Sequence, residues 1–131
     1  MTVKKLVLAQ VTSLDAMIAE GQKGPPGLVA TWAKKELQPL LKKLKFTFDT
    51  EISGTYPLIV QFRRKGCTDV EAKAVVDVLS KTFKIPFQTG VQNTYSPFVK
   101  LSRRFTPFPG VFGYFVVTLG HNGSLAVKFT M

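Results

Sequence analysis

The chain has 131 residues and a formal net charge of +10, from 18 Lys and Arg against 8 Asp and Glu. A hydrophobic content of 45% with 11% aromatic residues excludes a disordered chain, and the length predicts a single basic domain over residues 1–131. The sequence has no signal-peptide core and no apolar run long enough for a membrane span, and its one cysteine, Cys67, excludes an internal disulfide. We therefore expect a protein of the cytoplasm or another reducing intracellular compartment, with no membrane partner.

Two helices are predicted in the first third of the chain, after a strand over residues 3–11. Thr12 or Ser13 can cap a short helix that ends at Gly21. Residues 28–45 then predict an amphipathic helix with leucines on one side and lysines on the other. Because proline lacks a backbone N–H and clashes with the preceding turn, we expect a kink or a break near Pro39.

A β-hairpin is predicted next, because apolar and polar residues alternate on both sides of a turn at Gly54. The expected register places Phe46 opposite Phe62, and Phe48 opposite Val60. The apolar side chains of both strands then share one face of the hairpin.

The sequence Thr68-Asp69-Val70-Glu71 has the pattern of a capping box, which predicts the start of a long helix. Pro86 prevents this helix from continuing. The buried stripe of the helix is predicted to consist of Val70, Ala74, Val75, Val78, Leu79 and Phe83.

The last third of the chain predicts further strands. Residues 85–110 are irregular in pattern, with one short strand expected near residues 98–101. Strands over residues 111–119 and 124–130 end the chain, and Asn122-Gly123 between them favours a tight primed turn. Because hairpins prevail, we predict an α+β fold with a mainly antiparallel sheet built from hairpins and two to three helices packed on one face.

The sequence offers little for catalysis. His121, the one histidine, falls in a predicted turn, and a single cysteine leaves no zinc cluster or Cys/His pair to build. Asp49 and Glu51 could together bind Mg²⁺ in a nuclease, although ordinary solvent-facing acids are the favoured interpretation. Cys67 follows three basic residues and precedes a helix, an environment that lowers the pKa of a thiol. We predict no catalytic residue, no metal site and no cofactor.

One segment is similar to a nucleic-acid-binding motif without matching it. Phe112-Gly113-Tyr114-Phe115-Val116-Val117 has aromatic residues like those of the RNA-reading strand of RRM domains. However, the basic residue expected before the glycine is Phe112, and the order of elements departs from βαββαβ. The chain is therefore assigned to no family.

Positive charge gathers in three clusters that contain few acids, which is typical of proteins that bind phosphate groups. The predicted nucleic-acid-binding residues are Lys34, Lys35, Lys42, Lys43, Arg63, Arg64, Lys100, Arg103 and Arg104. The predicted interface or stacking residues are Trp32, Tyr95, Phe98 and Phe105. Burial against neighbouring elements is the alternative for these rings, and it is slightly favoured for Trp32.

Two functional hypotheses follow from these features. The first is a non-enzymatic basic protein that contacts the phosphate backbone of DNA or RNA, or another polyanion such as an acidic protein surface. The second is a structural or assembly subunit of a virion or other large complex, in which the aromatic, Pro-rich loop and Trp32 lie in subunit contacts. A homo-oligomer is compatible with both.

Overall fold

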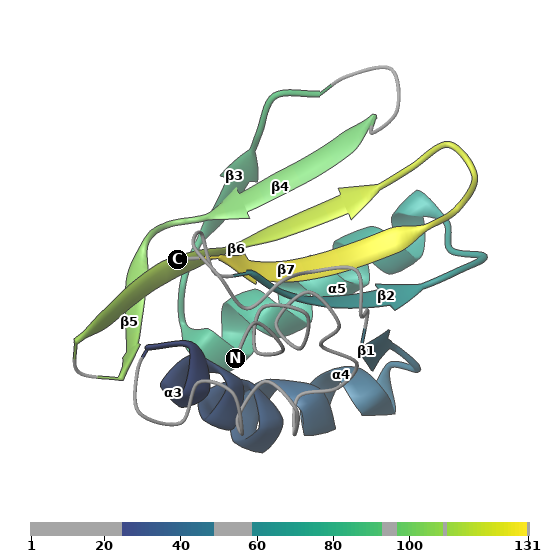
Figure 1. Cartoon of the computed structure of the whole chain (residues 1–131). Helices are drawn as coiled ribbons and strands as arrows, with labels where there is room; N and C mark the ends of the chain where they lie inside the picture. Colours follow the sequence, from purple (N-terminus) through teal and green to yellow (C-terminus); the bar gives the residue numbers. More distant parts are fainter. Residues whose placement is uncertain (1–24, 49–58, 93–96, 109, 131) are drawn as a thin grey trace, which may run out of the picture.

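The computed structural model describes residues 25–48, 59–92, 97–108 and 110–130 (Figure 1). The helices are α3 (Pro25–Trp32), the π-helical segment η1 (Ala33–Leu37), α4 (Gln38–Lys43) and α5 (Asp69–Phe83). The strands are β1 (Thr47–Phe48), β2 (Ile59–Arg64), β3 (Phe87–Thr89), β4 (Phe98–Ser102), β5 (Phe105–Phe108), β6 (Val111–Leu119) and β7 (Leu125–Thr130). The strand and helix predicted within residues 3–21 lie outside the described residues, as do the turn at Gly54 and the acids Asp49 and Glu51.

The strands form an antiparallel sheet in the order β1-β2-β7-β6-β4-β3, and β5 pairs with the beginning of β6. The predicted α+β class with a mainly antiparallel sheet is confirmed. At the centre lies the C-terminal hairpin of β6 and β7, in which Phe115 pairs with Phe129 and Val117 with Val127. These four side chains are fully buried on one face, because alternate residues of a strand point to the same side.

The loop of this hairpin differs from the tight primed turn that Asn122-Gly123 predicts. The Gly123 N–H donates to the Gly120 carbonyl at 3.1 Å, and the Gly120 N–H donates to the Ser124 carbonyl at 3.0 Å. Gly123 has a φ of 81°, whereas Asn122 is not among the residues with positive φ. The loop is therefore a three-residue connection with glycine in the left-handed position, which a primed turn is not.

The β1–β2 hairpin has a register two residues away from the predicted one. Phe48 lies opposite Phe62, and Thr47 lies opposite Arg63. A shift by two residues preserves the predicted face, because side chains alternate with a period of two, and Phe46, Val60 and Phe62 are all buried. Hydrophobic alternation specifies the face of a strand, but it does not distinguish registers that differ by two residues.

The first described helix runs from Pro25 to Lys43 and contains a π-helical turn where Pro39 was expected to disturb it. In this turn the N–H of Gln38 donates to the carbonyl of Ala33, five residues earlier. Pro39 then falls in the first turn of α4, where its missing N–H is tolerated. The irregularity takes the form of a π-bulge within a continuing helix.

Helix α5 begins at the predicted capping box. The backbone N–H and the hydroxyl of Thr68 lie 2.7 and 2.9 Å from the Glu71 carboxylate. The predicted stripe is partly wrong, because Val70 is 72% exposed and Ala74 is also exposed. The side chains that turn inward are Ala72, Val75 and Leu79, with Val76 and Phe83 packed against the core. The predicted and the observed stripe both have helical spacing. Only packing against the sheet decides which side of the helix is buried.

Residues 85–110 contain more strand than their pattern suggests. The short strand expected near residues 98–101 is present as β4, but β3 and β5 were not predicted. Both are short, and each pairs with a longer neighbour, β3 with β4 and β5 with β6. Pro107 lies within β5, and a proline disfavours a strand because it has no backbone N–H to donate.

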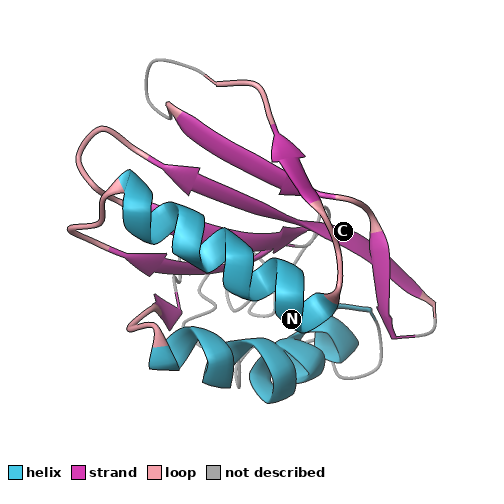
Figure 2. Cartoon of the chain, turned by 180° about the vertical axis from the view of Figure 1, so that it is seen from behind, coloured by secondary structure: helices cyan, strands magenta, loops and turns pink. Residues whose placement is uncertain are grey.

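A cluster of aromatic rings joins the helices to the sheet. The Trp32 ring of α3 and the Phe83 ring of α5 lie 6.3 and 5.2 Å from the Phe115 ring. Trp32 also lies 4.9 Å from Phe129, and these distances suit tilted and edge-on aromatic pairs. Because Phe115 and Phe129 share a face, α3 and α5 both contact that face, which Figure 2 shows from behind. No helix in the described ranges combines the length and apolar character needed to cross a membrane.

Candidate nucleic-acid interface

The helix from α3 to α4 has one apolar side and one charged side. Its fully buried residues are Val29, Ala33, Leu37 and Leu41. Its exposed lysines are Lys34, Lys35, Lys42 and Lys43. All four lysines that were predicted to bind nucleic acid on this helix are therefore accessible to solvent, with the exposed acid Glu36 among them.

A tight turn at the end of α4 folds the chain back beneath the helix. The N–H of Lys45 donates to the Lys42 carbonyl at 3.0 Å, and the N–H of Phe46 donates to the Leu41 carbonyl at 2.9 Å. These two bonds form a Schellman motif, in which Lys45 has a left-handed φ of 68°. Glycine is the usual residue at this position. The exposed Lys45 thus adds a positive charge at the end of α4.

Arg64 connects strand β2 to two helices. Its Nη1 donates to the Leu44 carbonyl at 3.2 Å, and its Nη2 donates to the Glu71 carboxylate at 3.1 Å. Leu44 caps the C-terminal end of α4, and Glu71 lies in the first turn of α5. Arg64, which is predicted as a phosphate contact, thus donates to protein acceptors at the ends of two helices. Arg64 is a structural link, because the ends of three elements converge on its guanidinium.

The contacts of Arg64 bring two of the three basic clusters together. Arg63 pairs across the hairpin with Thr47, two residues after Lys45, and its Nη1 donates to Ser124 Oγ at 2.8 Å. Arg63 is half-buried, whereas Lys65 is exposed. We define the α4–β2 basic patch as Lys42, Lys43, Lys45, Arg63 and Lys65. Lysines of the helix and cations of the hairpin thus lie at one end of the molecule.

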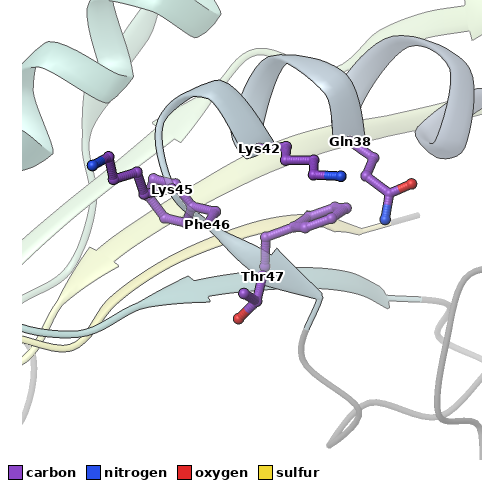
Figure 3. A pocket seen from close by; sticks show the side chains of 6 residues that line it. Gln38, Lys42, Lys45, Phe46 and Thr47 are labelled. Carbon is purple, nitrogen blue, oxygen red and sulfur yellow. The ribbon is translucent and has the colours of Figure 1, made fainter.

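A pocket opens within this patch, between α4 and the β1–β2 hairpin (Figure 3). It has a volume of about 380 Å³. The described residues that line it are Gln38, Lys42, Lys45, Phe46, Thr47 and Phe62. Of these, only Lys42 was among the predicted site residues. The signal that could have indicated Gln38 is its spacing of four residues from Lys42, which places both on one helix face.

The third cluster lies elsewhere. Arg103 and Arg104 are exposed in the connection between β4 and β5, and the N–H of Arg103 donates to the Pro86 carbonyl at 3.3 Å. Pro86 follows the C-terminal end of α5, whereas Arg64 contacts its first turn. The 15 residues of α5 span roughly 22 Å, at about 1.5 Å per residue. Arg103 and Arg104 are thus separated from the α4–β2 basic patch by the length of a helix.

Lys100 is held against the edge of the sheet. Its Nζ lies 2.7 Å from Thr89 Oγ1 on the neighbouring strand β3 and 6.0 Å from the centre of the Phe98 ring. The side chain is half-buried. Lys100 therefore contributes a cross-strand contact, at some distance along the sheet order from β1 and β2.

The predicted stacking residues serve mainly as packing residues. Trp32 is 9% exposed and belongs to the aromatic cluster, which agrees with burial against neighbouring elements, the interpretation slightly favoured for it. Phe105 lies 5.5 Å from Phe115, and Phe98 also packs against the core. Burial is more favourable than exposure for these rings, because they join the helices to the sheet and remove much apolar area from water. Tyr95 lies outside the described residues.

The surroundings of Cys67 are not those of a reactive thiol. Cys67 is buried, and this burial raises the pKa of its thiol, with the Glu71 carboxylate also raising it and Arg64 opposing them. The expected lowering of this pKa is therefore wrong. Among the described residues, no three His, Cys, Asp or Glu side chains gather where they could hold a metal ion. His121 is exposed in the β6–β7 loop.

Comparison of the chain with models of protein families, with curated proteins and with solved structures finds no match.

Proposed function

We propose that the chain binds nucleic acid, or another polyanion, through the α4–β2 basic patch and catalyses no reaction. The observation that supports this proposal is the bond from Arg64 to the Leu44 carbonyl, which brings two basic segments that lie twenty residues apart in sequence close to one another. The patch cations Lys42, Lys43, Lys45 and Lys65 are exposed. Such a surface suits phosphate groups, and we place the protein in a reducing compartment such as the cytoplasm.

Binding through phosphate contacts has a characteristic dependence on salt. Each phosphate that a lysine neutralises releases a counterion, so the affinity falls as salt rises, with a slope of about 0.9 per contact on duplex DNA. Fluorescence anisotropy with labelled DNA and RNA over a series of salt concentrations measures this slope. Affinity that does not change with salt, or no binding of either nucleic acid, would refute the proposal.

Two matched double variants locate the surface. Lys42→Gln with Lys43→Gln removes two exposed cations of the patch, and Arg103→Gln with Arg104→Gln removes two exposed cations at the other end of α5. Both lower the net charge by the same amount, so a general charge effect acts equally on both. We expect the lysine variant to weaken binding and to lower the salt slope by about 2. The arginine variant should cause a much smaller loss of affinity and a much smaller change of slope. The reverse order would place the surface at Arg103 and Arg104.

We propose a structural or assembly subunit, such as one of a virion, as the second candidate. It is favoured by Leu28, which is 49% exposed and lines a hollow of about 270 Å³ together with Thr31, Trp32, Lys35 and Glu36. Phe112 is also 60% exposed. Apolar residues at such positions are suited to subunit contacts. Size-exclusion chromatography with light scattering tests this candidate. A ring or polymer that does not bind nucleic acid would contradict the first proposal and support the second.

A further inference from the structure

A second group of exposed cations lies at the C-terminal end of α5. Lys81 lies in the last turn of this helix, and Lys84 follows the helix in a left-handed conformation with a φ of 55°. The Arg103 N–H donates to the Pro86 carbonyl at 3.3 Å, which holds the β4–β5 connection against this end. We define the α5 C-terminal patch by four exposed residues, Lys81, Lys84, Arg103 and Arg104. The chain thus carries a basic patch at each end of α5.

The two patches lie at opposite ends of the molecule. The end of α4 and strand β2 lie at the right of Figure 1, whereas β5 and its connection to β4 lie at the left. Helix α5 separates them by roughly 22 Å, at about 1.5 Å per residue. Physiological salt screens exposed charges over only about 8 Å. Each patch therefore attracts phosphate groups independently of the other.

The surface of α5 between the patches carries acids as well as a lysine. Asp69 and Asp77 are exposed, and the exposed Lys73 lies between them. A duplex that lay along α5 to reach both patches would bring its phosphates against these carboxylates, and like charges repel. The charge pattern therefore favours separate nucleic-acid segments at the two ends of the helix.

The two patches differ in their positive charge. The α4–β2 basic patch has five cations, whereas the α5 C-terminal patch has four. The exposed acid Asp77 lies one helical turn before Lys81. Glu36 also approaches this end of α5, since it lines a hollow together with Thr82. A first segment therefore binds at the α4–β2 basic patch, and the weaker patch remains available for a second segment.

We infer that the chain holds two nucleic-acid segments at once, one at each end of α5, and so bridges them. The inference rests on the proposed function, because the α4–β2 basic patch supplies the first contact. Val75 and Leu79 of α5 are buried against the core, so the spacing of the two patches is fixed by the packed body of the chain. A chain with one basic surface would bind each segment separately and join none.

The test uses two short duplexes of the same sequence, one immobilised on beads and one fluorescently labelled, as DNA and as RNA in parallel. DNA duplexes of about 20 bp do not fold back, because the persistence length is about 150 bp. We expect the full chain to retain the labelled duplex on the beads at low salt and to release it as the salt concentration rises. Fluorescence anisotropy with the labelled duplex alone measures the first contact separately.

Arg103→Gln with Arg104→Gln removes half of the cations of the α5 C-terminal patch. This variant is expected to retain on the order of tenfold less labelled duplex, with a much smaller loss of affinity in the anisotropy measurement. Arg103→Lys with Arg104→Lys is the matched control. It keeps both charges, so it should bridge as well as the original chain.

Binding in the anisotropy measurement without retention of the labelled duplex would refute bridging and leave the proposed function intact. Equal retention by the original chain and the glutamine variant would also refute the inference, and would indicate that two copies of the chain associate with one segment each. Loss of retention by the lysine variant would show that the charge of this patch is not the cause, which refutes the inference as well. No salt-dependent binding in either measurement would refute both bridging and the proposed function.

Discussion

Arg64 Nη1 lies 3.2 Å from the carbonyl oxygen of Leu44, so that strand β2 holds the C-terminal end of helix α4. This single contact joins two segments that carry much of the positive charge of the chain. Because Arg64 also pairs with Glu71, the same side chain positions the first turn of α5. The candidate interface therefore depends on a residue that is itself partly hidden from a ligand.

Replacing Arg64 with methionine is expected to lower the free energy of unfolding. The aliphatic part of the side chain is retained, but the Leu44 carbonyl loses a charged donor, which costs about 1 to 2 kcal/mol. Urea denaturation measures the change. Arg104→Met, at an exposed position, is the control and should change stability by less than about 0.5 kcal/mol. Equal effects of the two variants would mean that the link does not stabilise the fold.

Lys45→Gly and Lys84→Gly should separate the backbone effect from the charge effect. Both lysines have left-handed backbones at helix ends, with φ of 68° and 55°. Glycine removes this strain, so both variants are expected to be more stable by up to about 1 kcal/mol in thermal or urea unfolding. Only Lys45→Gly removes a charge from the α4–β2 basic patch, so only that variant should bind nucleic acid less tightly. A stronger effect on binding from Lys84→Gly would place the interface at the other end of α5.

The Glu71 carboxylate is expected to make stability depend on pH in the acid range. Hydrogen bonds from the backbone and the hydroxyl of Thr68 lower the pKa of Glu71 below its ordinary value, and Arg64 lowers it further. A lowered pKa in the folded state means that the stabilisation is complete above the pKa of the unfolded chain and is lost as the pH falls through the folded pKa.

Glu71→Gln retains a side chain suited to the capping box but cannot ionise. The variant should be less stable than the original chain at neutral pH, and the two should converge as the pH falls below about 4. Urea denaturation at a series of pH values measures the difference. A difference in stability that stays constant down to low pH would show that the charge of Glu71 contributes nothing.

Trp32 should report on folding and not on ligand binding. Its ring is buried among Phe83, Phe105, Phe115 and Phe129, so a bound base cannot stack on it. Because Trp32 is the one tryptophan of the chain, its fluorescence should stay unchanged on titration with nucleic acid and shift to the red on unfolding. Quenching in proportion to occupancy would place the ligand beside the aromatic cluster instead of the α4–β2 basic patch.

The sequence by itself determined the features that depend on residues close together in the chain. The capping box of Thr68 and Glu71 and the two C-terminal strands were predicted, because their signals are a helix cap and a period of two. The face of each strand in the β1–β2 hairpin was also predicted. Its register was not predicted, because registers that differ by two residues give the same alternation of apolar and polar side chains.

Only the tertiary structure decided which side of α5 is buried and which basic clusters meet. Two stripes of α5 have helical spacing and share Val75 and Leu79, and packing against the sheet selects the one that contains Ala72 instead of Val70 and Ala74. In the same way, the sequence located three basic clusters but could not group them. The Arg64 bond to Leu44 spans twenty residues, and the length of α5 keeps Arg103 apart. Such contacts arise from folding of the whole chain, and no local pattern of residues encodes them.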